Sequence, residues 1–141
     1  MTAETTTQTR TEQAGTDYAI EVWPNGNAHR DFLIRIETPE FTSVCPKTGL
    51  PDFGTILVEY VPDTNCIELK AFKYYLLGYR NRGIFYENAV NQILDDILAV
   101  CQPRYIKITG SFTPRGGIST EVVLTHHQEG FDTKRLAGLF E

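Results

Sequence analysis

A cysteine and an aspartate lie in one stretch of the chain, residues 41–53, that two prolines and a glycine interrupt. Apolar, strand-like sequence borders this stretch on both sides. Irregular segments between strands often carry catalytic groups, so Cys45 is a candidate nucleophile and Asp52 a candidate proton donor. An isolated cysteine is, however, more often a small buried hydrophobic side chain. These residues alone leave both interpretations open.

Three cations fall on one side of a predicted helix, residues 66–80: Lys70, Lys73 and Arg80. Such spacing is typical of a solvated cationic face. The same face could bind the phosphates of a nucleotide, which lysine and arginine suit. Glu68 is predicted on the opposite side, either as an ordinary helix-start carboxylate or as an acceptor for the N–H groups of a bound heterocycle.

Glu87 has the same ambiguity at the start of a second predicted helix, residues 85–101. Helix capping explains it, but beside Tyr86 it could also accept two adjacent N–H groups of a guanine-like edge while the ring stacks. Arg115 precedes two glycines in a predicted hairpin turn. A tight turn is the ordinary explanation, and phosphate binding by the arginine and the exposed amides is the alternative.

The apolar pattern predicts four strands and two helices in the order β-β-α-α-β-β. The strands are expected at 30–37, 52–61, 104–112 and 118–126, and the helices at 66–80 and 85–101. Strands at both ends and helices in the middle indicate an α+β fold, an antiparallel four-stranded sheet with both helices on one face. The other face also carries apolar residues, so we expect neighbouring subunits to cover it.

The composition of the 141 residues, 41% hydrophobic and 22% charged, is typical of one globular domain. We expect residues 18–141 to form that domain, residues 1–17 to be a disordered tail and the segment from 128 to be weakly ordered. The formal net charge of −5 disfavours direct binding of nucleic acid. No apolar run approaches the ~20 residues of a membrane span and none resembles a signal peptide, so a cytoplasmic protein without a membrane partner is expected.

Metal and nucleotide motifs were also sought. Cys45, Cys66 and Cys101 have no close spacing, which disfavours a disulfide framework and a structural zinc site. The adjacent His126 and His127 would point to opposite faces of a strand. Neither a dinucleotide-binding glycine motif, nor a Walker loop, nor a serine-triad signature is present. No metal site is therefore expected.

Three motifs occur in a fixed order: FTSVCPKTG at 41–49 with PD at 51–52, ELKAFKYYL at 68–76, and FTPRGGI at 112–118. Together they resemble the NADPH-dependent 7-cyano-7-deazaguanine reductases, nitrile reductases of the queuosine pathway of tRNA modification. The resemblance covers about residues 31–119 and fits the short, single-module form. It implies the tunnelling fold, in which the sheets of a homo-oligomer join into a barrel with sites between subunits.

The resemblance also implies roles for individual residues. It makes Cys45 the nucleophile and Asp52 the general acid. It assigns the substrate, 7-cyano-7-deazaguanine, to Ile67, Glu68, Leu69, Tyr86 and Glu87, and the phosphates of NADPH to Lys70, Lys73 and Arg115. The chain departs from the family twice, with Leu69 where serine is common and Tyr86 where many members have histidine.

In the implied reaction the Cys45 thiolate adds to the nitrile carbon and Asp52 protonates the nitrogen, giving a thioimidate that two NADPH reduce to a primary amine. Asp52 must then hold a proton, so a dry environment is expected. Three alternatives remain: a relative that transfers amide or ammonia without NADPH, a zinc-dependent pterin cyclohydrolase of similar fold, and a non-catalytic oligomeric binding module. The retained cations disfavour the first, and the histidine and cysteine spacing disfavours the second.

Overall fold

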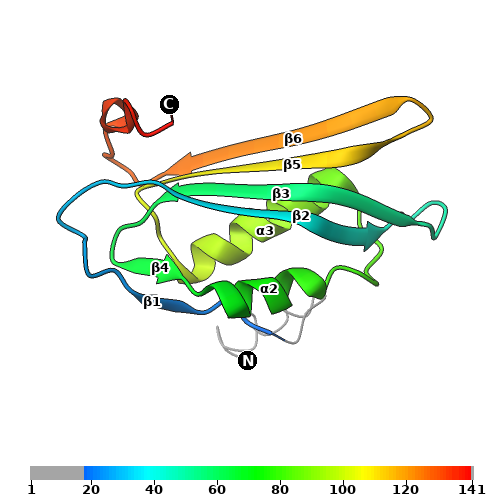
Figure 1. Cartoon of the computed structure of the whole chain (residues 1–141), viewed down its shortest axis with the longest axis horizontal. Coiled ribbons are helices and arrows are strands. Elements are labelled where there is room, and N and C mark those ends of the chain that lie inside the picture. Colours follow the sequence, from blue (N-terminus) through cyan, green and yellow to red (C-terminus); the bar gives the residue numbers. More distant parts are fainter. Residues whose placement is uncertain (1–17, 141) are drawn as a thin grey trace.

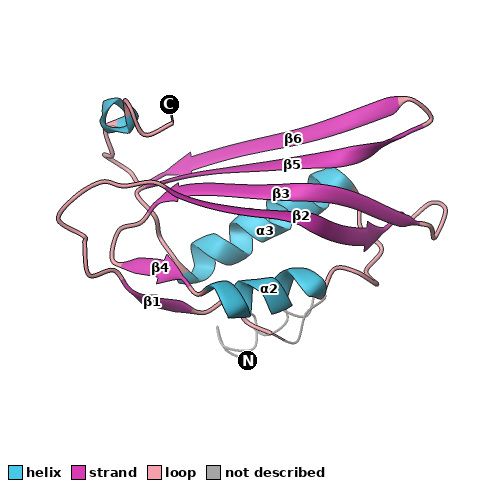
Figure 2. Cartoon of the chain, viewed as in Figure 1, coloured by secondary structure: helices cyan, strands magenta, loops and turns pink. Residues whose placement is uncertain are grey.

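The computed structural model describes residues 18–140, so the tail predicted at 1–17 lies outside the described residues. One layer is an antiparallel sheet and the other is a pair of helices on one of its faces (Figures 1 and 2). The sheet has the order β2-β3-β5-β6, formed by β2 (Ile34–Val44), β3 (Pro51–Val61), β5 (Tyr105–Arg115) and β6 (Ile118–His127). The helices are α2 (Leu69–Leu77) and α3 (Tyr86–Val100). The predicted α+β fold and the order of its six main elements are confirmed.

Smaller elements complete the described chain. Two short strands, β1 (Val22–Pro24) and β4 (Asn65–Ile67), form a second sheet beside the start of α2 (Figure 1). A 3-10 turn, η1 (Thr133–Leu136), lies near the C-terminus. The segment from 128, expected to be weakly ordered, instead packs back on the domain, since Phe131 is buried and Arg135 forms an ion pair with Asp31 at 2.7 Å.

The core lies between the sheet and the helices. Alternate residues of β3 and β5 lie opposite one another and face the helices, and they are Ile56, Val58, Tyr60, Ile106 and Ile108. The apolar stripe of α3 packs on them and is fully buried at Val90, Ile93 and Ile97. Each such aliphatic side chain contributes about 1.5–3 kcal/mol on leaving water. The apolar residues that alternate along the strands and the apolar stripe of the helix therefore pack against each other in one core layer.

The opposite sheet face is mixed rather than apolar. Leu57 is half-buried there and Val123 is 46% exposed, beside a Glu59–Arg35 ion pair at 2.9 Å. The expectation that apolar residues occur on this face holds, but charged groups share it.

Several predicted boundaries were wrong, and the two that matter for the site are the start of the first helix and the end of the first strand. The first helix does not include Cys66 and Ile67, which belong to β4 because they pair with β1. The helix begins after Glu68, whose carboxylate accepts the backbone N–H groups of Lys70 and Ala71, both at 2.9 Å. A side-chain acceptor at this position satisfies N–H groups that have no partner within the helix.

The stretch 41–53 was also misjudged, since most of it is strand. β2 continues to Val44 because a bulge between Thr38 and Phe41 breaks the register and accommodates Pro39. Only residues 45–50 remain as a connection between β2 and β3.

One end of the molecule gathers three segments that lie far apart in the sequence. The β2–β3 connection, the start of α3 and the β5–β6 turn all lie there (Figure 1). The turn consists of Gly116 and Gly117, with φ of 57° and 80°, which is the backbone that two-residue hairpins require. A site built at this end would therefore use three separate segments.

The packing of α3 on β5 yields a stability prediction. A Cβ atom at Gly110 would lie 2.7 Å from the Cγ2 of Val90 and 3.0 Å from the ring of Phe112, closer than real contacts allow. We expect Gly110→Ala to lower the free energy of unfolding by about 1–3 kcal/mol, measured by urea denaturation. The control Gly26→Ala, where nothing lies within 4 Å, should stay within about 0.5 kcal/mol of the parent. Equal stability of the two variants would contradict this packing.

Candidate active site

A pocket of about 310 Å³ lies at the end where the three segments meet. Its size is at the lower end of the range of small-molecule sites. The residues lining it come from the β2–β3 connection, α3 and the β5–β6 hairpin, and they are Cys45, Asp52, Phe85, Tyr86, Glu87, Thr113, Arg115, Ile118 and Thr120. Both predicted catalytic residues therefore share one pocket.

Cys45 begins the tight connection after β2. Its N–H donates to the carbonyl of Leu50 at 2.9 Å and its carbonyl accepts from Gly49 at 2.9 Å, so the backbone is closed around it. The hydroxyl of Thr48, followed by the backbone N–H groups of Thr48 and Lys47, lowers the pKa of the Cys45 thiol below its usual range. Hydrogen bonds to sulfur stabilise the thiolate, which is the nucleophilic form.

Asp52 lies at the start of β3 and is only 6% exposed. Its Oδ1 lies 3.0 Å from the Nε of Arg115. The burial agrees with the dry environment expected for a general acid, whereas the ion pair was not foreseen. Ser43 is the cross-strand partner of Asp52, and within residues 18–140 its buried hydroxyl has no hydrogen-bond partner.

Tyr86 and Glu87 form the first turn of α3 and close the pocket from the helix side. The ring of Tyr86 stacks on Phe112 with centroids 3.9 Å apart and planes 10° apart. Burial, and then a hydrogen bond from its hydroxyl to the carboxylate of Asp52, raises the pKa of Tyr86. Glu87 is exposed, and among residues 18–140 no side chain or backbone group pairs with its carboxylate. Glu87 is thus free to accept hydrogen bonds from a ligand.

Comparison with known proteins identifies the family. A family model described as QueF-like protein matches residues 51–130. A protein of Elusimicrobium minutum named NADPH-dependent 7-cyano-7-deazaguanine reductase is 56% identical over 110 residues, covering 78% of this chain and 83% of that protein. One of the same name from Chlorobaculum tepidum is 58% identical over 107 residues, covering 76% of this chain and 92% of its own. The chain belongs to the QueF-like family.

A solved structure supports the same conclusion. The crystal structure of the archaeosine synthase QueF-Like in the apo form has a TM-score of 0.62 and 31% identity, over 66% of this chain and 91% of that one. The subunit fold expected from the three motifs is therefore confirmed, whereas the joining of sheets into an oligomeric barrel stays a prediction. In this QueF-like chain the pocket described above contains Cys45 and Asp52, together with Tyr86 and Glu87, the pair at the start of α3.

Apart from Arg115, the remaining predicted residues lie elsewhere on this QueF-like chain, at or near the start of α2. Ile67 is buried in β4, and Leu69 is 60% exposed. Glu68 and Lys70 line one hollow with Tyr74, while Lys73 lines another. The prediction that Glu68 lies opposite Lys70 on the helix is wrong, because Glu68 caps the helix from outside its first turn.

The hollow that Lys73 lines is a groove of about 680 Å³ between α2 and β2, and Arg80 lines it as well. Lysine and arginine side chains with an apolar floor suit a phosphorylated ligand. Arg115, the third residue predicted to bind NADPH, lies in the Cys45 pocket instead. Within one chain, the three residues predicted to bind NADPH therefore line three different hollows, and the predicted substrate residues are likewise not gathered in one place.

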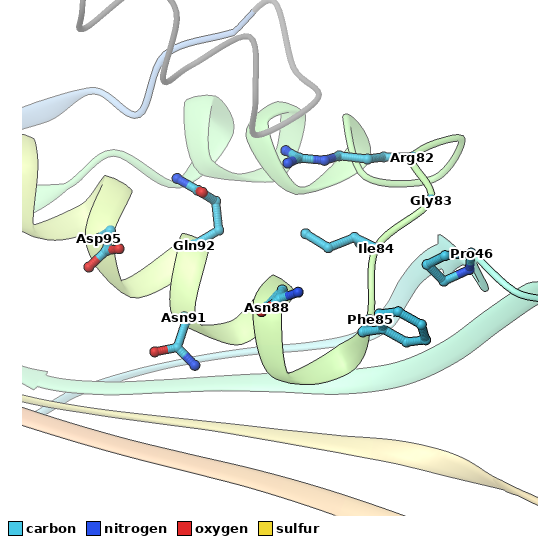
Figure 3. A pocket seen from close by; sticks show the side chains of 9 residues that line it. All are labelled: Pro46, Arg82, Gly83, Ile84, Phe85, Asn88, Asn91, Gln92 and Asp95. Atoms are coloured by element: carbon cyan, nitrogen blue, oxygen red, sulfur yellow. The ribbon is translucent and has the colours of Figure 1, made fainter.

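A further hollow, of about 450 Å³, adjoins the Cys45 pocket, and Phe85 lines both. Figure 3 shows it between the 82–85 segment and the first turns of α3. Its polar lining consists of Arg82, Asn88, Asn91, Gln92 and Asp95. None of these is a nucleophile, so the candidate chemistry belongs to the Cys45 pocket.

In residues 18–140 no three or more histidine, cysteine or acidic side chains gather as metal ligands. No helix in the same range is long and apolar enough to cross a membrane. Cys66 and Cys101 are free and buried at the other end of the domain from Cys45.

Sequence reasoning did not assign roles to Thr48 or Phe112, although both lie inside recognised motifs. Thr48 follows the cysteine by three residues, a spacing that could have indicated a local hydrogen bond. Phe112 supports Tyr86 only through a long-range contact between β5 and α3, for which the sequence carried no signal.

The hydrogen bonds to Cys45 predict how its reactivity responds to mutation. Removing the Thr48 hydroxyl should raise the pKa of the Cys45 thiol and so reduce the thiolate fraction at pH 7. We expect Thr48→Val to react more slowly with iodoacetamide at Cys45 and to reach full reactivity at higher pH, as followed by peptide mass spectrometry. Thr64→Val, in an exposed turn at the opposite end of β3, is the matched control. Identical rate–pH curves for Thr48→Val and the control would refute the assigned cause.

Proposed function

We propose that this chain reduces the nitrile of 7-cyano-7-deazaguanine to a primary amine with NADPH, as a step of queuosine biosynthesis in the cytoplasm. The observation that carries the proposal is the meeting of Cys45 and Asp52 in one pocket, where the Cys45 thiol has a lowered pKa. Relatives named for this activity, at 56–58% identity, support it. No direct nucleic-acid or membrane partner is part of the proposal, and residues 18–141 are proposed to act as one domain.

The first step needs only groups of this chain and the substrate. The sulfur of Cys45 adds to the nitrile carbon, forming an S–C bond, and Asp52 delivers one proton to the nitrile nitrogen. The product is a covalent thioimidate, and Asp52 is left as a carboxylate. A cysteine with stabilised thiolate and a carboxyl within the same pocket are the two groups that this addition requires.

The helix-start pair is proposed to hold the heterocycle. Glu87 presents an unpaired carboxylate to the pocket, and a guanine-like edge offers two adjacent N–H donors. Tyr86 keeps an aromatic face where many family members have histidine, and its ring is fixed by stacking on Phe112. This pair would orient the nitrile toward Cys45.

NADPH, when bound, supplies hydride, and two molecules are consumed per nitrile because conversion to the amine adds two hydrides and two protons. Lys70, Lys73 and Arg115 are proposed to bind its phosphates. In one chain Lys70 and Lys73 face hollows other than the Cys45 pocket. We therefore propose a homo-oligomeric barrel in which α2 of one copy, with Ile67, Glu68 and Leu69, completes the pocket of its neighbour.

An amide- or ammonia-transferring activity is the second candidate, since the solved archaeosine synthase shares the fold. That enzyme is 31% identical to this chain, whereas reductase-named relatives reach 58%. The retained cations also favour an NADPH-dependent reaction. Both candidates form the same adduct, and they differ in the reaction that consumes it.

The covalent step is tested without NADPH. We expect incubation with 7-cyano-7-deazaguanine to add the mass of the intact nitrile to the protein, because addition releases nothing. Cys45→Ala should show no such adduct by intact-mass spectrometry. Cys66→Ala, which removes a buried thiol far from the pocket, should still form it. An adduct on Cys45→Ala would show that another residue is the nucleophile.

The redox step is tested by NADPH absorbance. With 7-cyano-7-deazaguanine we expect oxidation of two NADPH per nitrile, unaffected by a metal chelator and absent in Cys45→Ala. Adduct formation without NADPH oxidation, together with amide or ammonia incorporation, would favour the second candidate.

A further inference from the structure

Arg115 contacts both residues at the start of β3. Its Nε lies 3.0 Å from the Oδ1 of Asp52, and its Nη2 donates to the carbonyl of Pro51. The Asp52 side chain is 8% exposed and that of Arg115 is 45% exposed. The guanidinium thus covers the carboxylate from the solvent side and is anchored by its bond to the Pro51 carbonyl, while the Tyr86 hydroxyl donates to the same carboxylate.

The β5–β6 hairpin explains how Arg115 reaches this position. Backbone pairing between β3 and β5 runs only as far as Gly54 and Phe112. Beyond that pair, the side chain of Arg115 makes the connection between the two strands. Arg115 is itself fixed, because it pairs with Ile118 across the two-glycine turn.

The charges around Asp52 make this contact important. The titratable groups facing it are Cys45 from the β2–β3 connection, Tyr86 and Glu87 from α3, and Arg115 from the hairpin. Within the part of the chain that the structure describes, Arg115 is the one cation among the residues lining the pocket. The addition moves one negative charge from the Cys45 thiolate to the Asp52 carboxylate, and a cation beside both groups balances that charge before and after the step.

We propose that Arg115 is a positioning residue for Asp52 in the addition step, in which it aims the carboxyl group at the nitrile nitrogen and balances the charges of the pocket. This inference rests on the proposed function and goes beyond the role of Arg115 in binding NADPH phosphates. The guanidinium uses Nε and Nη2 for the β3 start, which leaves the Nη1 hydrogens for a phosphate. Both roles are compatible, but only the positioning role acts when NADPH is absent.

Thioimidate formation without NADPH therefore separates the two roles. We expect Arg115→Met to form the adduct about tenfold to a hundredfold more slowly, as when a hydrogen bond between charged groups is lost. Arg115→Lys keeps the positive charge, so it should recover part of the rate, which a merely structural role of Arg115 would not predict.

A double-mutant cycle tests whether Arg115 acts through Asp52. In an Asp52→Asn background, Arg115→Met should change the adduct rate by less than about twofold, because the carboxyl group that Arg115 positions has already been removed. An equal loss in both backgrounds, or an unchanged rate of the single variant, would overturn the proposal. Circular dichroism checks folding, and Arg115→Gln replaces the methionine variant if that variant is unfolded.

The proposed function can fail separately. If the parent protein forms no adduct, the nitrile substrate is wrong, while the positioning of Asp52 can still be measured. In protein labelled with carbon-13, the carboxyl chemical shift of Asp52 should then differ between Arg115→Met and the parent, because the ion pair is lost. An unchanged chemical shift in that experiment would overturn the ion pair itself.

Discussion

The central strand β3 constrains everything else in the site. It is hydrogen-bonded to β2 along one edge and to β5 along the other, so its register cannot slip without turning the buried Ile56, Val58 and Tyr60 away from the helices. Its first residues extend just past the end of the β5 pairing. Asp52 is therefore held by core packing and by pairing with Ser43 of β2, yet its other edge lies beyond the β5 pairing, where side chains can approach.

The same register explains why the pocket combines distant parts of the sequence. Antiparallel hairpins place the β2–β3 connection and the β5–β6 turn at one end of the sheet, and α3 begins at that end (Figure 1). The topology thus brings together Cys45, Glu87 and Arg115. The apolar stripe of α3 packs on the sheet and so fixes how far the first turn of this helix lies from the sheet. The chemistry then depends on short polar contacts: Thr48 to the thiol and Arg115 to Asp52.

Local patterns in the sequence were sufficient for the order of the elements, because periodicity reflects burial within each element. They were insufficient where a long-range contact decided the outcome. Cys66 and Ile67 suit a helix, but pairing with β1 makes them strand. For the site, the motifs supplied candidate residues, whereas the pairing of Arg115 with the Pro51–Asp52 corner spans 64 residues and has no local signature.

Residues of α2 show what one chain cannot provide. A helix of nine residues is about 13 Å long at 1.5 Å per residue, and α2 begins beside β4, on the side away from the Cys45 connection (Figure 1). Glu68 is also already engaged by two backbone N–H groups at that start. If Glu68 and the lysines bind the same ligands as Glu87, a second copy must present them, because α2 cannot slide along the core on which Phe72 and Tyr75 are buried. The division of the site within one chain is thus itself an argument for the proposed assembly.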